Sequence, residues 1–392
     1  MINRRDFLKI AGTLGAVASS SDALSATWVK VNTDPNIIHG TWVPVANPVP
    51  PVDKAADIRA RGQTSLVLRS DGCLWSAGTL QATSTFAQIL GILGTVDVAC
   101  GNISNTVLAL HANGTVMVKG ANSYGQLGLG TTVASSAFTQ VAANTVAVAT
   151  DGYSSFLLKS NGLIYSSGNN SAGQAANGTI VNTSTFTQCL GVSLVKRIAT
   201  GYLSAYALSA GGLVYATGTN SSGQLANGTV SNQSSFAQCL GVSKVRAIAA
   251  NLSSAYALGV NGLVYATGAN PYGQLANGTV SSQSSFVQCI GVSNATAIAS
   301  GANHVLALRA DGLLFACGNN AQGQLGLNST ASTSTFTQCL GLSRIIAISC
   351  GDSHSLALRA DGTLFSCGYN GQGETGTGLG ASVLSFAPCI GV

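Results

Sequence analysis

Two neighbouring stretches of the chain are nearly identical. GTNSSGQLANGTVSNQSSFAQCLGV occupies 218–242, and GANPYGQLANGTVSSQSSFVQCIGV follows at 268–292. A small turn pair with glycine in second place precedes each stretch, and the same pair recurs along the chain at 71–72, 113–114, 161–162, 211–212, 261–262, 311–312 and 361–362. The intervals are 42, 48 and then 50 residues. A fixed period of this length indicates a propeller or a solenoid.

Each repeat contains four predicted strands. The first has the pattern V-x-x-I-A-x-G, as in VKRIATG (195–201), and the second alternates up to the turn pair, as in HSLALRA (354–360). The turn pair supplies the positive φ angles of a tight hairpin. A third strand, a glycine-rich loop and a fourth strand such as SFTQCLGV (185–192) complete the repeat. No window shows helical periodicity, so we predict an all-β chain whose residues 55–392 form a seven-bladed β-propeller of four-stranded antiparallel blades.

The residue types predict how the blades pack. The first strand of each repeat is richest in Ala, Ser and Gly, and small side chains suit the place where the blades converge. We therefore place this strand innermost. The fourth strand carries a recurrent phenylalanine, which we expect to fill the wider gap between blades: Phe86, Phe138, Phe186, Phe236, Phe286, Phe336 and Phe386. Blade-to-blade packing then explains the repetition.

The repeats resemble those of the regulator of chromosome condensation family. The stretches that carry the resemblance are NSYGQLGLGT (122–131), NNAQGQLGLNST (319–330) and ISCGDSHSLALRADGTLFSCGYN (348–370). The resemblance covers 55–392 and implies a seven-bladed propeller. It says little about function, because one fold carries many functions.

The ends of the repeat array depart from the pattern. The first repeat passes from Gly78 to Phe86 in 8 residues where the others take 18, so it lacks the GQLG loop. A segment at 27–54 precedes it and contains TWVPVAN (41–47), which resembles a fourth strand. This stretch could pair with the C-terminal SFAPCIGV (385–392) to close the ring, or displace it from its blade. The sequence leaves both arrangements open.

The N-terminal residues 1–26 resemble a twin-arginine export signal. Arg4 and Arg5 are followed by Asp6, Phe7, Leu8 and Lys9, then by a modest apolar run and small residues. An ordinary secretory signal with a basic start is the alternative. Both predict a periplasmic or secreted bacterial protein. We expect no transmembrane segment in the mature chain, because the other apolar runs are short.

Composition argues against nucleic acid as the partner. Charged residues make up 7 % of the chain, against about 25 % in ordinary domains, and no basic run is present. The glycine-rich loops resemble phosphate cradles, but no helix follows them and the P-loop lysine is missing. We predict no nucleotide or other cofactor.

The candidate catalytic and metal-binding groups favour structural roles. His304 and His354 occupy one position in neighbouring repeats, where we expect each imidazole to hydrogen-bond the backbone. No metal site is predicted, since no acid or thiol partner recurs beside them. Five of the ten cysteines recur at one fourth-strand position and are predicted to be buried and unpaired; one Cys317–Cys350 disulfide is conceivable. Asp352 and Glu374 are a weak acid–base pair, so we predict no enzyme.

The loops that follow the first and third strands should emerge on one face of the ring. Tyrosines among Ser, Asn and Gly on such loops are typical of a recognition surface. The predicted partner-binding residues are Tyr124, Tyr153, Tyr202, Tyr272, Asn303, Asp352, Tyr369 and Glu374. We predict an exported scaffold that binds a macromolecule, most simply another protein. The alternatives are a nucleotide-exchange regulator, as the resemblance implies, or a carbohydrate-active propeller enzyme.

Overall fold

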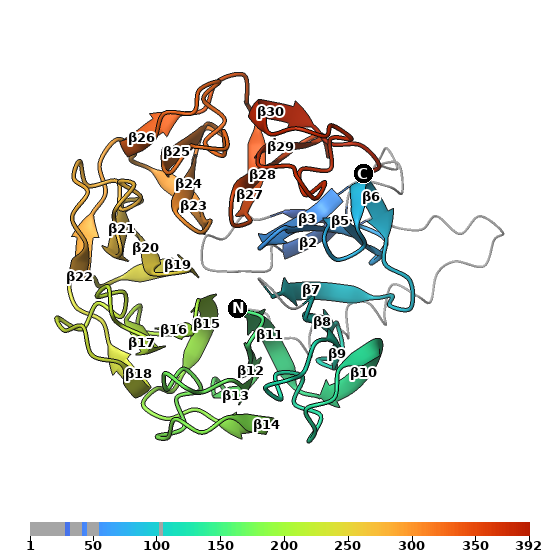
Figure 1. Cartoon of the computed structure of the whole chain (residues 1–392), viewed down its shortest axis with the longest axis vertical. Helices are drawn as coiled ribbons and strands as arrows, with labels where there is room; N and C mark the ends of the chain where they lie inside the picture. The colour runs from blue at the N-terminus through green and yellow to red at the C-terminus, as the bar shows by residue number, and fades with distance from the viewer. Residues whose placement is uncertain (1–27, 32–40, 45–54, 102–104) are drawn as a thin grey trace.

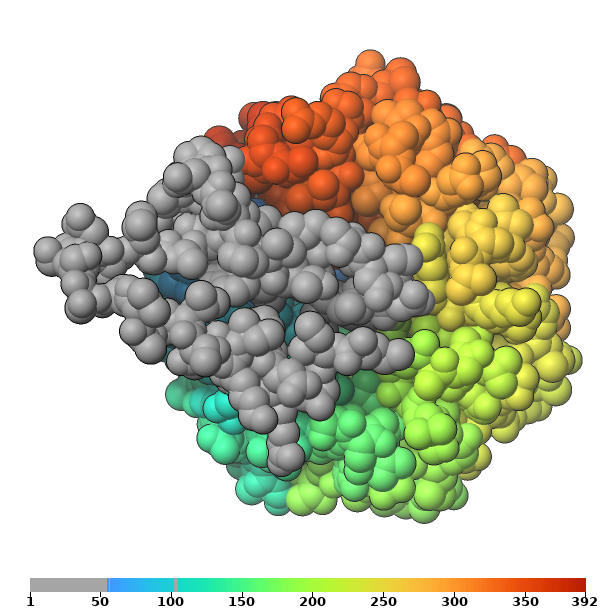
Figure 2. Space-filling model, turned by 180° about the vertical axis from the view of Figure 1, so that it is seen from behind, coloured from blue at the N-terminus to red at the C-terminus, as the bar shows by residue number. Residues whose placement is uncertain are grey.

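The computed structural model describes residues 28–31, 41–44, 55–101 and 105–392, and within them the chain forms a seven-bladed β-propeller. Each blade is a four-stranded antiparallel sheet whose strands follow one another in chain order. The blades stand around a central axis (Figure 1). From behind, their order around the ring follows the colour sequence from green to red (Figure 2). This architecture confirms the predicted fold.

The blades are numbered from the N-terminus. Blade 1 contains β3 (Ala55–Arg61), β4 (Thr64–Arg69), β5 (Leu74–Gly78) and β6 (Thr83–Gln88). Blade 2 contains β7 (Thr95–Cys100), β8 (Val107–His111), β9 (Val116–Gly120) and β10 (Ser135–Ala142). Blade 3 contains β11 (Thr145–Thr150), β12 (Ser154–Lys159), β13 (Ile164–Gly168) and β14 (Thr183–Gln188). Blade 4 contains β15 (Val195–Gly201), β16 (Ser204–Ser209), β17 (Val214–Gly218) and β18 (Gln233–Gln238).

The remaining three blades follow the same plan. Blade 5 contains β19 (Val245–Asn251), β20 (Ser254–Gly259), β21 (Val264–Gly268) and β22 (Gln283–Gln288). Blade 6 contains β23 (Ala295–Ser300), β24 (His304–Arg309), β25 (Leu314–Gly318) and β26 (Thr333–Gln338). Blade 7 contains β27 (Ile345–Cys350), β28 (His354–Arg359), β29 (Leu364–Gly368) and β30 (Val383–Pro388).

Among the described strands, none is shared between the first and last blades at the ring closure. The two remaining strands, β1 (Trp28–Val31) and β2 (Thr41–Pro44), pair with each other, while β30 pairs with β29 of its own blade. Residues 41–44, part of the 41–47 stretch that could close the ring, pair with 28–31 in the described part of the chain. Residues 45–47 and the 1–26 signal lie outside the described residues. Closure uses an ordinary blade contact instead: the Phe86 N–H donates to the Ile390 carbonyl at 3.1 Å.

The first strand of each blade is innermost, as predicted. These strands contact one another around the axis, whereas the second, third and fourth strands lie progressively farther out (Figure 1). They line an axial channel with small side chains that include Ala99, Ala149, Ala199, Ala249 and Ala299. Methyl groups allow seven strands to converge where larger side chains would collide.

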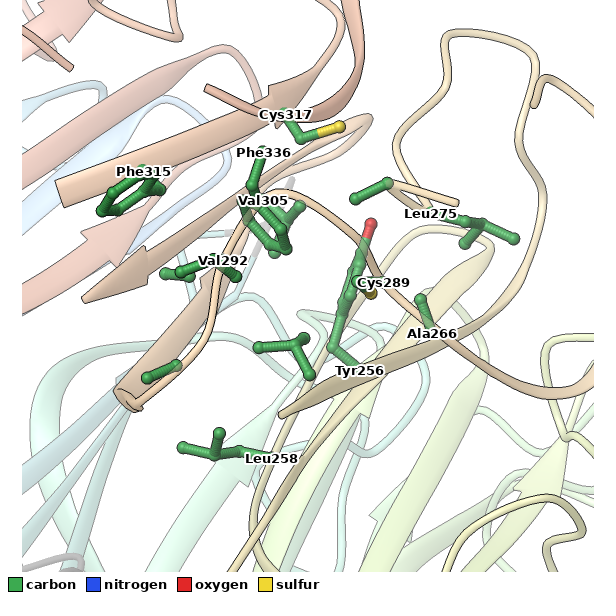
Figure 3. Close-up of a cluster of buried hydrophobic side chains, with 14 residues drawn as sticks. Tyr256, Leu258, Ala266, Leu275, Cys289, Val292, Val305, Phe315, Cys317 and Phe336 are labelled. Atoms are coloured by element: carbon green, nitrogen blue, oxygen red, sulfur yellow. The ribbon is translucent and has the colours of Figure 1, made fainter. Parts of the chain in front are cut away.

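The core lies between blades, where the recurrent phenylalanine of one blade enters its predecessor. Between blades 5 and 6, Phe336 packs with Tyr256, Leu275 and Cys289 of blade 5 (Figure 3). At the closure, Phe86 of blade 1 packs in the same way with Leu356 and other residues of blade 7. The prediction that these phenylalanines fill the gaps between blades is confirmed for both positions. Burying each ring stabilises the interface by about 2–3 kcal/mol.

The hairpin turns are of a different type from the one predicted. Only the glycine of each turn pair has positive φ; Gly312, for example, has φ 79°, while Asp311 does not have positive φ. The Gly312 N–H donates to the Arg309 carbonyl at 3.0 Å, and the Asp311 carboxylate accepts from the Leu313 N–H at 3.2 Å. This is a type I turn followed by a glycine bulge. Asn and Asp suit the second-last position of this turn because their side-chain oxygen accepts from the N–H two residues later, as Asp311 does from Leu313.

All ten cysteines are free thiols, so the conceivable Cys317–Cys350 disulfide is absent. The Cys317 sulfur instead lies 3.2 Å from the Gly273 carbonyl oxygen and 3.0 Å from the Thr333 carbonyl oxygen, and its single S–H can donate to either. Four of the five recurrent fourth-strand thiols are buried, and Cys389 is half-buried. Burial raises the pKa of Cys189 and Cys339 to about 12, which keeps both thiols protonated and unreactive.

Candidate partner-binding face

The loops after the first and third strands emerge on one side of the ring, as predicted, and we call this side the loop face. Hydrogen bonds join the two loop types. The Asn169 N–H donates to the Tyr153 carbonyl at 2.9 Å, and Gln126 Nε2 donates to the Gly152 carbonyl at 3.0 Å. The second bond reaches from the long loop of blade 2 to the short loop of blade 3. Each long loop thus braces the next blade.

A buried asparagine organises the long loops from within. In blade 4, the Asn220 side chain accepts from the Leu225 N–H at 2.9 Å and donates to the carbonyls of Thr229 and Ser231 at 3.0 and 3.1 Å. Asn170 and Asn270 make the corresponding bonds in blades 3 and 5. These bonds fix the loop without a partner, so a ligand would meet a preformed surface.

Three of the predicted tyrosines form a row across blades 2, 3 and 4. The rings of Tyr124 and Tyr153 meet edge to face with centroids 5.5 Å apart, and Tyr153 meets Tyr202 in the same way at 5.9 Å. Tyr202 is 36 % exposed and the other two are half-buried. Partial burial, together with the neighbouring phenols and Asp151, raises the pKa of Tyr153, so its hydroxyl stays a donor at neutral pH.

The buried side chain of Asp151 fixes the backbone of the loops that carry this tyrosine row. Its buried carboxylate accepts from the backbone N–H groups of Tyr153 at 2.9 Å, Ser154 at 2.6 Å and Leu203 at 3.1 Å. Burial raises the pKa of Asp151, and these hydrogen bonds oppose the rise. Because Leu203 lies next to Tyr202, one carboxylate fixes the loops that carry two of the three rings.

Tyr272 and Asn303 occupy blades 5 and 6. Tyr272 is 45 % exposed, and its backbone N–H donates to Gln274 Oε1 at 3.0 Å. Gln274 Nε2 in turn donates to Asn303 Oδ1 at 3.4 Å. Asn303 is half-buried and holds the long loop of blade 5 through this bond, while the Tyr272 side chain is exposed.

The last three predicted residues, Asp352, Tyr369 and Glu374, line one pocket of about 450 Å³. Among the described residues, Gln63, Thr79, Asn105 and Ser353 also line it. Glu374 is not the surface residue that the sequence predicted, because it is 0 % exposed. Its Oε2 accepts from the Gln372 N–H at 2.7 Å, the same contact that glutamine makes in other blades. Burial raises the pKa of Glu374.

Arg61 is a functional candidate that the sequence analysis missed, and it spans the axial channel of about 390 Å³ at its loop-face end. Its Nη1 donates to the carbonyls of Thr200 at 2.8 Å and Ala250 at 3.3 Å, on blades 4 and 5. Burial lowers the pKa of Arg61, and the carboxylates of Asp151 and Asp352 oppose the lowering. A charged residue in a strand otherwise suited to small side chains was the available signal.

His304 and His354 are structural, but not as predicted. Each Nε2 contacts a serine hydroxyl of the next blade, Ser355 at 3.0 Å and Ser65 at 2.8 Å, rather than the backbone. Those hydroxyls donate to backbone carbonyls, so each histidine donates to a serine. Burial lowers the pKa of both imidazoles to about 3 and keeps them neutral.

The described part of the chain contains no cluster of three or more His, Cys, Asp or Glu side chains suited to hold a metal ion. Within the same residues, no helix has the length and apolar character needed to span a bilayer.

The geometry defines a seven-bladed β-propeller whose braced loops form one preorganised face. The RCC1-like domain matches residues 81–388, and the chain belongs to that family. No curated protein matches the sequence. Among solved structures, human WBSCR16 has a TM-score of 0.70 at 23 % identity, covering 78 % of this chain and 84 % of that one.

Two yeast structures are also similar to this chain. Yeast RCC1 (Prp20), in its complex with Kap60, has a TM-score of 0.72 at 17 % identity, covering 88 % of this chain and 91 % of that one. Prp20p from Saccharomyces cerevisiae has a TM-score of 0.71 at 19 % identity, covering 88 % of this chain and 87 % of that one. At these identities the likeness establishes the fold alone.

Proposed function

We propose that this protein is an exported binding scaffold that recognises a protein partner through the tyrosine row of its loop face and catalyses no reaction. The observation that carries the proposal is the contact of Tyr124 with Tyr153 and of Tyr153 with Tyr202 across three blades. Aromatic rings held by their neighbours offer contact area at a small entropic cost, which favours recognition. RCC1-like propellers bind proteins, and Kap60 bound to yeast RCC1 is an instance.

The low charge of the chain supports a protein rather than a nucleic-acid partner. Phosphate recognition needs several lysines or arginines on one face, and the row is flanked by Ser, Asn and Gly instead. Tyrosine-rich surfaces with small polar neighbours are typical of protein interfaces. The interface would be compact, because anchors on three adjacent blades dominate it.

The test is capture of a partner with matched variants. The protein is incubated with envelope and culture fluid of the source bacterium, and cross-linked peptides are identified by mass spectrometry. The partner is then purified and titrated against wild type, Tyr153→Ser with Tyr202→Ser, and the control Val260→Ser with Leu340→Ser. The control residues are exposed aliphatic side chains at a second–third strand turn and at a link between blades, both on the opposite face.

We expect the tyrosine variant to weaken binding at least about 100-fold, since each ring is an interface anchor worth ~2 kcal/mol. The control variant should bind as wild type does. Equal binding by all three proteins, or a reproducible failure to capture any partner, would refute the proposal.

Export is the second part of the proposal and rests on Arg4 and Arg5 in the sequence. Residues 1–26 are fused to a reporter that is active only after folding in the cytoplasm. We expect the reporter in the periplasm, and retention in the cytoplasm when both arginines are replaced by lysine, because the twin-arginine pathway reads that pair. Unchanged export of the lysine variant would indicate an ordinary secretory signal instead.

A further inference from the structure

The pocket between blades 7 and 1 exists because blade 1 lacks a long loop. In blade 1 only residues 79–82 connect β5 to β6, while residues 369–382 connect β29 to β30 in blade 7. The described lining residues come from three blades: Glu374 and Tyr369 from blade 7, Gln63 and Thr79 from blade 1, and Asn105 from blade 2. The space of about 450 Å³ therefore lies where the missing loop would stand.

Glu374 is the residue that makes this space unusual. The five other long loops carry glutamine at this position: Gln126, Gln174, Gln224, Gln274 and Gln324. The glutamine oxygen accepts from the N–H two residues earlier, and the amide group of Gln126 or Gln274 donates to the next blade. A carboxylate reproduces the first contact and cannot make the second.

The second carboxylate oxygen of Glu374 is consequently left over. Glu374 as a whole is 0 % exposed, so water does not reach Oε1 either, and this oxygen has no hydrogen-bond partner within the described residues. A buried, unsatisfied carboxylate oxygen is costly, and such a group is rare unless something binds it. Glu374 lines the pocket, so the missing donor can come from a molecule that enters it.

The rest of the lining indicates what kind of donor fits. Asp352 contributes a second carboxylate, which also interacts electrostatically with the guanidinium of Arg61. Gln63, Thr79 and Ser353 add neutral oxygen acceptors, and Tyr369 adds an aromatic ring. Carboxylates, hydroxyls and a ring together suit a planar cation with several N–H donors. A guanidinium meets that description better than an ammonium, because it loses water more easily and stacks on rings.

We propose that the pocket between blades 7 and 1 binds a guanidinium group, as on an arginine side chain, with Glu374 as its principal acceptor. The inference deepens the proposed function and rests on it only for the source of that arginine, which is a partner protein docked on the loop face. The tyrosine row and the pocket are then two separate anchors on one face.

The experiment uses small probes and the full-length chain. N-acetyl-arginine amide is titrated calorimetrically into wild type, with N-acetyl-citrulline amide as the uncharged probe and N-acetyl-lysine amide as the ammonium. The test variant is Glu374→Gln, which installs the residue of the five other loops and so suits this backbone. The control variant is Gln324→Glu, which places a carboxylate at the same position in blade 6, beside a blade that has its long loop.

We expect saturable binding of the arginine probe to wild type and a loss of about tenfold or more in Glu374→Gln, as for the loss of a charge-assisted hydrogen bond. The citrulline probe should not bind, and the lysine probe should bind more weakly. Gln324→Glu should match wild type. Without any probe, Glu374→Gln should melt higher at neutral pH, because an unsatisfied buried carboxylate has been removed.

No saturable binding of the arginine probe to wild type would overturn the inference, as would equal binding to Glu374→Gln. The single-residue probe needs no partner protein. Loss of partner capture with intact probe binding would therefore refute only the proposed function. Intact capture without probe binding would refute only the pocket.

Discussion

The interface between blades 5 and 6 and the one between blades 7 and 1 show what the repeat holds constant and what it allows to vary. In both, a phenylalanine of the later blade enters the earlier blade, and its N–H donates to a carbonyl there: Phe336 to Ile290 at 3.0 Å and Phe86 to Ile390 at 3.1 Å. The hydrophobic contact between blades is thus independent of the ring closure.

The buried polar contacts of the two interfaces differ. In blade 5 the Tyr256 hydroxyl donates to the Gln274 carbonyl at 2.9 Å. At the closure, the Ser65 hydroxyl donates to the Glu374 carbonyl at 2.6 Å, and His354 supports that serine at 2.8 Å. The same carbonyl position must be satisfied in both places, and one phenol or a serine–histidine pair can do it. The loops above differ too, since blade 1 lacks the one that blade 6 has.

The largest expected effect tests the shared part of the comparison. Phe86→Ala and Phe336→Ala each remove a ring that is 4 % exposed, so each should lower the free energy of unfolding by about 3–5 kcal/mol. The two losses should agree within about 1 kcal/mol. Denaturant unfolding followed by tryptophan fluorescence and circular dichroism measures both.

The outcome also tests the ring closure. A much smaller loss for Phe86→Ala would mean that blades 7 and 1 separate more easily than blades 5 and 6, and that the closure is the weak point of the ring. Leu340→Ser, an exposed change on the opposite face, serves as the control and should cost less than about 0.5 kcal/mol.

A smaller effect tests the part that differs. Burial lowers the pKa of His354 to about 3, whereas an unfolded histidine titrates near 6.5. Below pH 6.5 the unfolded chain binds a proton that the folded chain does not, so stability falls as the pH drops from 6.5 toward 3. Between pH 7.5 and pH 5.5 this histidine should account for a loss of about 1.4 kcal/mol.

His354→Gln should remove the part of the pH dependence that this histidine causes. Tyr256→Phe should instead lower the free energy of unfolding by the same amount at each acidic pH, because a buried phenol does not ionise there. Denaturant unfolding of the wild type and both variants at several pH values provides the comparison. An unchanged pH dependence in His354→Gln would show that the imidazole takes up its proton at the same pH in the folded and the unfolded chain, so that burial does not lower its pKa.

The sequence could predict on which face of the ring most of the candidate residues lie, but it could not predict the contacts between them. Tyr124, Tyr153 and Tyr202 were expected on one face because loop order in a propeller is fixed by strand order. Their edge-to-face contacts depend on the distance between blades, which no local pattern encodes. Glu374 was expected at the surface because it lies in a loop, yet the folded structure buries its side chain.

The amino-acid sequence alone determined the all-β class, the four strands of each blade, the number of blades and the inner position of the small-residue strand. These follow from local periodicity and from a repeat that each blade satisfies in the same way. The tertiary structure decided what depends on contacts between blades. Within the part of the chain that the structure describes, it closed the ring without a shared strand, placed Arg61 across the channel, and left a pocket beside Glu374 where the long loop of blade 1 is absent. Such contacts join residues hundreds of positions apart, and only the closed ring brings them together.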